Sequence, residues 1–217
     1  MQSQFKAYEK STAPPYLNYN FHSDNSPRTW MVDSILVILI DPGPTNLGFR
    51  IERRFTNGHV STEILTQVKL LECGKDVFTS ELAENTTRFL DGFREYHPHV
   101  HYVCVERQMS INFKCTRLLQ HIITYYMMIL KDLPLRPYLM EISPFLKSRE
   151  LHAPKGMNRT FLKKWTCGRA RQFLIERQDP WLTYFDSLQA MQQRDVADTI
   201  CMSEGLFKLL AREGIKN

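Results

Sequence analysis

The sequence predicts an α/β domain in which a mixed β-sheet, an antiparallel meander plus parallel strands, is flanked by helices. Three observations predict it: a continuously apolar run at residues 34–41, a hairpin signal at residues 56–59, and alternating helix-like and strand-like patterns after residue 78. An antiparallel meander followed by alternating helices and strands implies a sheet with both kinds of pairing and with helices on its faces. The 217 residues are enough for about one such domain.

Three strands begin the predicted sheet. Residues 34–41 have the sequence SILVILID, and an uninterrupted apolar run of this length is typical of a strand buried on both faces. Residues 49–55 and 60–70 are the next two predicted strands, and the turn between them contains Asn57-Gly58. Because Asn-Gly favours the left-handed turn conformations of tight hairpins, these three strands are expected to form an antiparallel meander.

Helices and strands alternate over the rest of the chain. The apolar spacing predicts helices over 78–96, 112–131, 157–177 and 195–212, a helix start at Ser143-Pro144, and strands over 99–106 and 136–142. Residues 1–30 are rich in Ser, Pro, Asn and Tyr without a sustained period. They are therefore expected to be a flexible N-terminal tail, which leaves residues 31–217 as the folded domain.

The positive charge of the chain is concentrated in one stretch. The 28 Lys and Arg and 23 Asp and Glu give a formal net charge of +5. Residues 141–177 hold nine basic and three acidic residues, a net +6, so the remainder of the chain sums to −1. Such a stretch is either a solvated helix face or a surface that binds a polyanion.

Cysteine usage and hydropathy exclude several classes of protein. The five cysteines are an odd number and no two of them form a CxxC pair, so neither a zinc cluster nor a disulfide scaffold is expected. An intracellular, reducing compartment fits this pattern best. No apolar run approaches the roughly 18 residues of a membrane span, so no membrane partner is expected.

Acidic residues stand where a sheet-based catalytic site would need them. Asp41 ends the first buried strand, Glu106 ends the fourth, and Asp195 and Asp198 are three residues apart in the last predicted helix. The carboxyl ends of parallel strands meet at one rim of a sheet, and residues i and i+3 share a helix face. Four converging carboxylates need a counter-charge, which Mg²⁺ or Mn²⁺ can supply. Two such ions about 4 Å apart would serve phosphodiester hydrolysis.

Each acid also has a purely structural explanation. Asp41 can form a turn, Asp195 can cap its helix, and Glu106 can pair with a neighbouring arginine. The order of two strand-end acids followed by a helical Asp-x-x-Asp favours a shared metal site over three unrelated explanations.

Several segments resemble the motifs of RuvC-like Holliday junction resolvases of the RNase H-like superfamily. Residues 40–48 (IDPGPTNLG) are similar to the first motif, residues 103–108 (VCVERQ) to the second, and residues 194–200 (RDVADTI) to the last. Residues 142–147 (ISPFLK) resemble the Ser-Pro-x-x-Lys segment of the poxvirus and iridovirus branch. The resemblance extends over residues 34–212, and it matches the viral branch better than the fungal mitochondrial one.

The resemblance implies an RNase H-like nuclease that acts as a homodimer with Mg²⁺ or Mn²⁺ and makes paired nicks across a four-way DNA junction. It implies that the metal ligands are Asp41, Glu106, Asp195 and Asp198, and that Lys147 stabilises the scissile phosphate. The helix over 112–131 is apolar over a wide arc, which fits core packing or the dimer interface. Phe113 or Tyr126 is a further candidate, as a wedge at an unstacked base. The implied place of action is a viral replication site in the host cell, or a mitochondrion.

The basic stretch supplies candidates for DNA binding. Because carboxylates repel phosphate, a nuclease with four acids must attract the DNA backbone with basic residues beside them. The candidates lie between the last predicted strand and the last helix: Lys155, Arg159, Lys163, Lys164, Arg169 and Arg171. These charges cannot all share one helix face, but Arg159 with Lys163, and Lys164 with Arg171, can.

Other functions are kept as alternatives. An RNase H-like nuclease that acts on other branched DNA or on RNA/DNA hybrids would carry the same acids. An actin-like kinase or ATPase also has an Asp and a Gly-containing turn after its first strand. That class needs a second Asp-x-Gly loop and Gly-rich adenosine motifs, and the nine glycines of this chain are not arranged that way.

Overall fold

The computed structural model describes residues 14–19, 32–71, 78–109, 111–135 and 137–214. One mixed sheet has the strand order β1-β6-β5-β2-β3-β4. Its strands are β1 (Tyr16–Tyr19), β2 (Ser34–Asp41), β3 (Leu47–Phe55), β4 (Val60–Val68), β5 (Val100–Glu106) and β6 (Tyr138–Ile142). The pairs β2–β5 and β5–β6 are parallel and the remaining pairs are antiparallel, which confirms the predicted mixed sheet and the β2-β3-β4 meander.

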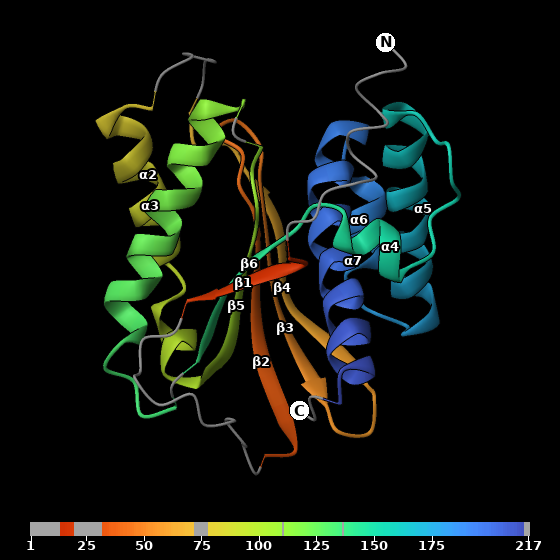
Figure 1. Cartoon of the computed structure of the whole chain (residues 1–217), viewed down its shortest axis with the longest axis horizontal. Helices are drawn as coiled ribbons and strands as arrows, with labels where there is room; N and C mark the ends of the chain where they lie inside the picture. The colour runs from red at the N-terminus through yellow and green to blue at the C-terminus, as the bar shows by residue number, and fades with distance from the viewer. Residues whose placement is uncertain (1–13, 20–31, 72–77, 110, 136, 215–217) are drawn as a thin grey trace.

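Helices cover both faces of this sheet (Figure 1). One face carries α2 (Ser80–Asp91) and α3 (Phe113–Leu130), with a short 3₁₀ helix η1 (Arg94–His99) leading into β5. The other face carries α4 (Leu146–Glu150), α5 (Arg159–Glu176), α6 (Leu182–Ser187) and α7 (Ala190–Arg212). The described part of the chain therefore forms three layers, with the sheet between two layers of helices.

Strand β2 contributes to the core on both sides of the sheet, because successive side chains of a strand point to opposite faces. Its even-numbered apolar residues pack under α2 and α3, and its odd-numbered ones under α4 and α7. The two sets are Leu36, Ile38 and Ile40, and Ile35, Val37 and Leu39. This double burial is why the SILVILID segment shows no polar alternation.

The register of the central strands brings the ends of β2 and β5 together. Ile40 pairs with Val105 in the parallel β2–β5 ladder, so Asp41 and Glu106 emerge at the same rim. Asp41 also pairs with Gly48 of β3 in the antiparallel ladder. The expectation that strand-end acids would share one rim is therefore correct for these two residues.

Part of the predicted N-terminal tail belongs to the sheet. Tyr16–Tyr19 pairs antiparallel with β6 as the outermost strand β1. The Ser143 N–H donates to the Pro15 carbonyl at 2.8 Å, and the Tyr19 hydroxyl donates to Glu141 Oε2 at 2.9 Å. A strand of four residues with two exposed positions has too little periodicity to be recognised in a sequence. The rest of the tail, residues 1–13 and 20–31, lies outside the described residues, and the boundary at residue 31 stays a prediction.

Two predicted helices differ in extent from the observed ones. The predicted helix over 78–96 is α2 followed by η1, which contains Pro98, a residue that cannot occupy the interior of an α-helix. Helix α7 begins at Ala190, because Gln189 and Gln192 form a capping box ahead of the acidic residues.

Four of the five cysteines fall within the described residues, and all four are free thiols. The fifth, Cys73, lies outside them. In the described part of the chain, no helix combines the length and the apolar character that a membrane crossing would require.

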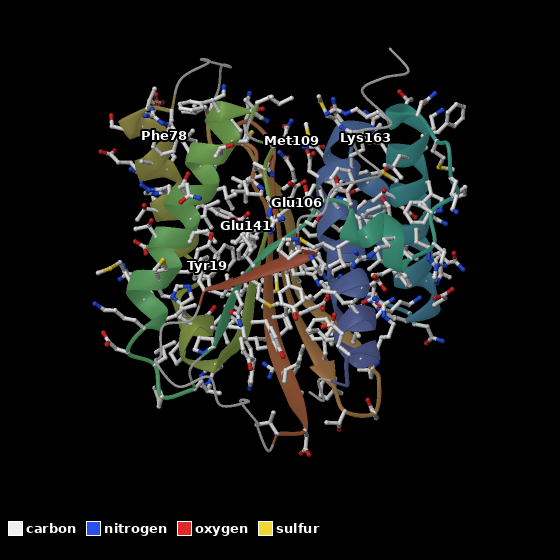
Figure 2. The ribbon with its side chains drawn as sticks, viewed as in Figure 1. Tyr19, Phe78, Glu106, Met109, Glu141 and Lys163 are labelled. Atoms are coloured by element: carbon white, nitrogen blue, oxygen red, sulfur yellow. The ribbon has the colours of Figure 1, made fainter. Side chains whose placement is uncertain are left out.

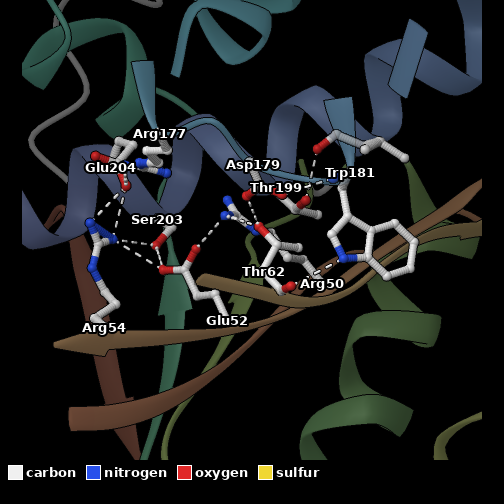
Figure 3. Close-up of polar contacts among 11 residues, drawn as sticks. Arg50, Glu52, Arg54, Thr62, Arg177, Asp179, Trp181, Thr199, Ser203 and Glu204 are labelled. Carbon is white, nitrogen blue, oxygen red and sulfur yellow. Dashed lines mark hydrogen bonds and ion pairs between the residues drawn. The ribbon is translucent and has the colours of Figure 1, made fainter. Parts of the chain in front are cut away.

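A buried network of charged side chains connects α7 to β3 (Figure 3). Arg50 and Glu52 of β3 form an ion pair of 2.9 Å in which both side chains are fully buried. Arg54, two residues further along the strand, lies 3.1 Å from Glu52 and 2.7 Å from Glu204 of α7. The Ser203 hydroxyl of α7 donates to Glu52. Because buried charges need partners, these pairs determine how α7 lies on the sheet.

The same network reaches the end of α5 and the segment before α6. Arg177 lies 2.7 Å from Glu204. The Thr62 hydroxyl of β4 donates to Asp179 at 2.5 Å, and the Trp181 indole N–H donates to the Thr62 carbonyl at 3.1 Å (Figure 3). The basic helix α5 is therefore held to the same strands as α7.

Candidate active site

The candidate site lies at the rim where β2 and β5 end. Asp41 and Glu106 are the last residues of these two parallel strands. Figure 2 shows Glu106 between the sheet and the helical layer of α4 to α7, with Lys163 of α5 in that layer. Only 8% of Glu106 is exposed, so its carboxylate is largely removed from solvent.

Lys147 of α4 reaches this rim and contacts two of the acids. Its Nζ lies 2.5 Å from Glu106 Oε1 and 2.6 Å from Asp198 Oδ1. Its side chain is 10% exposed. Helix α4 can lie this close to α7 because residue 205 is glycine: a Cβ there would lie 3.0 Å from the Lys147 Cα. The structure therefore brings Glu106, Asp198 and Lys147 together from three separate elements.

The charges in this cluster depend strongly on one another. Burial raises the pKa of Asp41 well above its usual range, and the charges of Glu106 and Asp198 raise it further, while Lys147 opposes them. Burial alone would lower the pKa of Lys147, but Asp198, Glu106 and Asp41 together raise it above its ordinary value. Lys147 is accordingly a charged ammonium that offsets part of the negative charge.

Asp195 lies next to this cluster rather than inside it. Burial, followed by the charge of Asp198, raises the pKa of Asp195 to about 7, whereas Lys163 and Arg194 act in the opposite direction. Its Oδ2 atom is buried and accepts no hydrogen bond from the described residues. The four predicted acids are thus neighbours: Glu106 and Asp198 contact Lys147, Asp41 interacts electrostatically with all three, and Asp195 lies one helical turn away from Asp198.

A close backbone approach and two side-chain hydrogen bonds accompany the packing of α7 beside the sheet. A Cβ at Gly48 of β3 would lie 2.4 Å from the Asp195 carbonyl oxygen, so the helix backbone approaches the strand at this glycine. The Gln67 side-chain amide of β4 donates to Asn46 Oδ1 at 3.3 Å, and that of Gln192 donates to Gln67 Oε1 at 3.2 Å. Sequence reasoning missed Gln67 and Gln192, because neither residue lies in a recognisable motif.

The donor chemistry fits a hard divalent cation, although the observed arrangement does not gather three ligands around one position. The candidate ligands are all carboxylates, which suit Mg²⁺ and Mn²⁺, and Asp195 has a buried oxygen without a partner. Among the residues that the structure describes, no group of three or more His, Cys, Asp or Glu side chains could hold a metal ion. Instead, the Lys147 ammonium lies between Glu106 and Asp198.

The six basic candidates fall into two groups. Burial raises the pKa of Asp195 and of Asp198, and Lys163 lies near enough to both acids to oppose this rise. Lys155, Arg159 and Lys164 are exposed. Further along α5, Arg171 forms a 2.8 Å ion pair with Asp186, and Arg169 lies 4.4 Å from the Phe173 ring centre. The amino-terminal part of α5 is therefore the part that lies beside the acids, and DNA binding by all six residues stays a prediction.

The two candidate wedge residues differ in exposure. Tyr126 is fully buried in the core between α3 and the sheet, so it cannot reach a base, and that alternative is wrong. Phe113 is 68% exposed at the start of α3.

Solved structures with this fold are known, although no protein-family model and no curated protein sequence matches the chain. A structure of Thermus thermophilus RuvC in complex with a Holliday junction substrate is 16% identical with a TM-score of 0.53, covering 83% of this chain and 98% of that one. A second T. thermophilus RuvC structure has 14% identity, a TM-score of 0.54 and the same coverage. The yeast mitochondrial Holliday junction resolvase Ydc2 has 14% identity and a TM-score of 0.56, covering 81% of this chain and 80% of that one. This chain therefore has the RNase H-like fold.

The close approach at Gly48 predicts a large effect of a small substitution. Gly48→Ala would place a methyl group 2.4 Å from the Asp195 carbonyl oxygen, so α7 must shift and the free energy of unfolding should fall by about 1–3 kcal/mol. Gly168→Ala on α5 is the matched control, since nothing lies within 4 Å of the added carbon. It should stabilise the protein by up to about 1 kcal/mol. Chemical denaturation of both variants measures the difference, and equal effects would contradict the contact.

The raised pKa of Asp195 predicts how stability depends on pH in the presence of a chelator. The Asp195 carboxyl holds its proton more tightly in the folded protein, with a pKa of about 7 against an ordinary 3.8. The contribution of this proton to the free energy of unfolding is therefore complete below about pH 4 and is lost as the pH rises through 7. Asn at this position does not titrate. The free energy of unfolding of Asp195→Asn relative to the natural protein should therefore rise by about 1–2 kcal/mol between pH 4 and pH 8, after allowance for solvent screening. A difference independent of pH would show that Asp195 has an ordinary pKa.

Proposed function

We propose that this protein is a metal-dependent endonuclease that resolves four-way DNA junctions by paired nicks. The observation that carries the proposal is that Lys147 contacts Glu106 and Asp198, with Asp41 near enough to interact electrostatically with all three, at the carboxyl rim of an RNase H-like sheet. The fold is shared with RuvC, whose structure was determined in complex with a Holliday junction substrate, and with the Holliday junction resolvase Ydc2. The fold and the acids together support hydrolysis of a phosphodiester in branched DNA.

Each residue of the candidate site has a role in this proposal. Asp41, Glu106, Asp195 and Asp198 would hold Mg²⁺ or Mn²⁺, two ions in the full site. Such ions, when bound, supply Lewis acidity for hydrolysis of the phosphodiester. The acids orient the reacting groups, and their burial keeps the surroundings low in dielectric, where charge interactions are stronger. Lys147 supplies a positive charge at the position where the scissile phosphate would approach.

The basic residues of the α5 region would hold the DNA backbone. Lys155, Arg159 and Lys164 are exposed, and Lys163 acts electrostatically on Asp195 and Asp198. Phosphate contacts of this kind give affinity without reading the base sequence. Arg169 and Arg171, which already have partners within the chain, would contribute at the far end of the same helix.

A homodimer would supply the second nick. Two-fold pairing places two identical sites at a fixed separation, which suits a junction with two-fold symmetry. Helix α3 buries seven residues against the sheet and α2, and leaves Met127 38% and Met128 61% exposed. We propose that Met127 and Met128 of α3 contribute to the dimer interface.

The source and place of action are proposed from the sequence resemblance alone. The Ser143-Pro144 segment and its neighbour Lys147 lead us to propose the poxvirus and iridovirus branch and a viral replication site in the host cell. A mitochondrial setting is the alternative. A nuclease that acts on other branched DNA or on RNA/DNA hybrids is the second candidate function, because the acids determine the chemistry and not the substrate.

The proposal predicts a distinctive product from a supercoiled plasmid that extrudes a cruciform. A dimer that nicks both opposing strands in one encounter yields linear DNA with Mg²⁺ and none with chelator. Asp198→Asn should bind junction DNA normally but cut it more than roughly 100-fold more slowly. Loss of a residue that only orients a metal ligand costs up to about 100-fold, and loss of a ligand itself should cost more. Glu84→Gln, exposed on α2 at the opposite face, is the control and should cut normally.

Other outcomes of the plasmid assay would contradict particular parts of the proposal. Nicked circles without linear product would argue against paired cutting by a dimer. Equal cutting of a linear duplex would remove the junction preference, and preferred cutting of an RNA/DNA hybrid would favour the second candidate function. Retained cutting by Asp198→Asn would remove this residue from the site.

The basic residues of α5 predict the salt dependence of DNA binding. Reversing the charge of Lys163 and Lys164 to Glu, in the Asp198→Asn background so that the DNA stays intact, should reduce the slope of log affinity against log salt by about one to two, because two phosphate contacts are lost. Reversing Arg88 and Arg94 on the opposite face should leave this slope unchanged. Fluorescence anisotropy at several salt concentrations measures both variants, and matching slopes would show α5 to be only a solvated surface.

A further inference from the structure

The ammonium of Lys147 lies where Glu106 and Asp198 would otherwise face each other. The distances from Nζ to the two carboxylates are 2.5 and 2.6 Å, so the ammonium contacts both directly. The side chains are 10% exposed for Lys147, 11% for Glu106 and 21% for Asp198. Water therefore has little access to the contacts, and the lysine is the cation that two of the acids share.

This arrangement has a clear electrostatic reason. Asp41, Glu106 and Asp198 lie in a buried cluster, and carboxylates this close together cannot all stay ionised without a counter-charge. A buried ion pair also depends on both partners, since removing one leaves the other uncompensated. Lys147 supplies part of this counter-charge.

The position of Lys147 is built into the packing of α4 on α7. Gly205 lets the Lys147 backbone approach α7, and Arg212 of α7 lies 2.8 Å from Glu150 of α4. The backbone is thus fixed at both ends of this short helix. The side chain has four methylene groups, so the ammonium can move while the backbone stays in place.

We infer that Lys147 is the internal counter-ion of the acid cluster, and that its ammonium must leave Glu106 and Asp198 before these carboxylates can bind a divalent cation. The inference rests on the proposed function in one respect, that the acids bind metal. Two cations on the same carboxylate oxygens would repel each other strongly at low dielectric. Lys147 thereby stabilises the empty site and weakens its affinity for metal. Once displaced, the ammonium is free to face a phosphate.

The inference is tested by Mn²⁺ binding to the full chain without DNA. Lys147→Met keeps an unbranched side chain only one atom shorter and removes its charge. We expect Mn²⁺, titrated by calorimetry or by its electron paramagnetic resonance signal, to bind this variant roughly 5- to 150-fold more tightly than the natural protein, the usual range of coupling between two binding events. With chelator, the variant should melt at a lower temperature, and saturating Mn²⁺ should raise its melting temperature more than that of the natural protein. Unchanged or weaker Mn²⁺ affinity in the variant would overturn the inference.

A second lysine separates direct displacement from general electrostatics. Lys163→Met removes the same charge from α5, close enough to act on Asp195 and Asp198, and should tighten Mn²⁺ binding much less. Equal tightening in both variants would overturn a specific role of Lys147. If Lys147→Met does not fold, Lys147→Gln also removes the charge but keeps a polar end. The same increase in Mn²⁺ affinity is expected for it, and unchanged or weaker affinity would again overturn the inference.

The test is independent of the junction assay. Tighter Mn²⁺ binding by the Lys147 variant would support the inference even if four-way junctions were not cut, in which case only the substrate would be wrong. Cutting of junctions in the presence of chelator, with no Mn²⁺ binding to either protein, would overturn both the metal dependence and the role of Lys147 as a competing cation.

Discussion

The contact of Lys147 with Glu106 and Asp198 joins the three parts of the molecule on which the site depends. Glu106 comes from the end of β5, Asp198 from α7, and Lys147 from the short helix between β6 and α5. None of these elements could shift by the length of one side chain without leaving a buried charge without its partner, which is expensive in a low-dielectric interior. The rest of the fold therefore has to hold β5, α7 and α4 in fixed positions relative to one another.

Most of the contacts that fix these positions act on α7. Glycine at residue 48 lets its backbone approach β3, and glycine at residue 205 lets α4 approach it. The Arg54–Glu204 ion pair and the hydrogen bond from Ser203 to Glu52 connect α7 to the sheet. The two glycines lie against the backbones of Asp195 and Lys147, whereas the Arg54–Glu204 pair lies further along α7. The positions of Asp195 and Asp198 are thus determined by the packing and the ion pairs of other residues of α7 and its neighbours.

The sequence could predict the features that depend on local pattern. The burial of β2 on both faces is visible in the sequence as an apolar run. The shared rim of Asp41 and Glu106 follows from their places at the ends of two predicted strands, because the carboxyl ends of parallel strands meet at one edge of a sheet. Contacts that depend on how helices cross were out of reach. The alternation of Arg50, Glu52 and Arg54 is visible in the sequence, but nothing local identifies Glu204 as a partner 150 residues away. The contact of Lys147 with two acids likewise depends on a helix crossing that no local pattern reveals.

The edge strand β1 has a consequence for the order of folding during synthesis. Its partner β6 follows it by more than a hundred residues, with Tyr16 opposite Ile142. The ribosome therefore releases β1 long before β6 exists, and the meander and α2 can form while the first segment waits unpaired. Pairings of such long sequence separation are slow to form. Strand β1 is accordingly expected to be among the last strands to join the sheet, with Tyr19 reaching Glu141 after the central strands have paired.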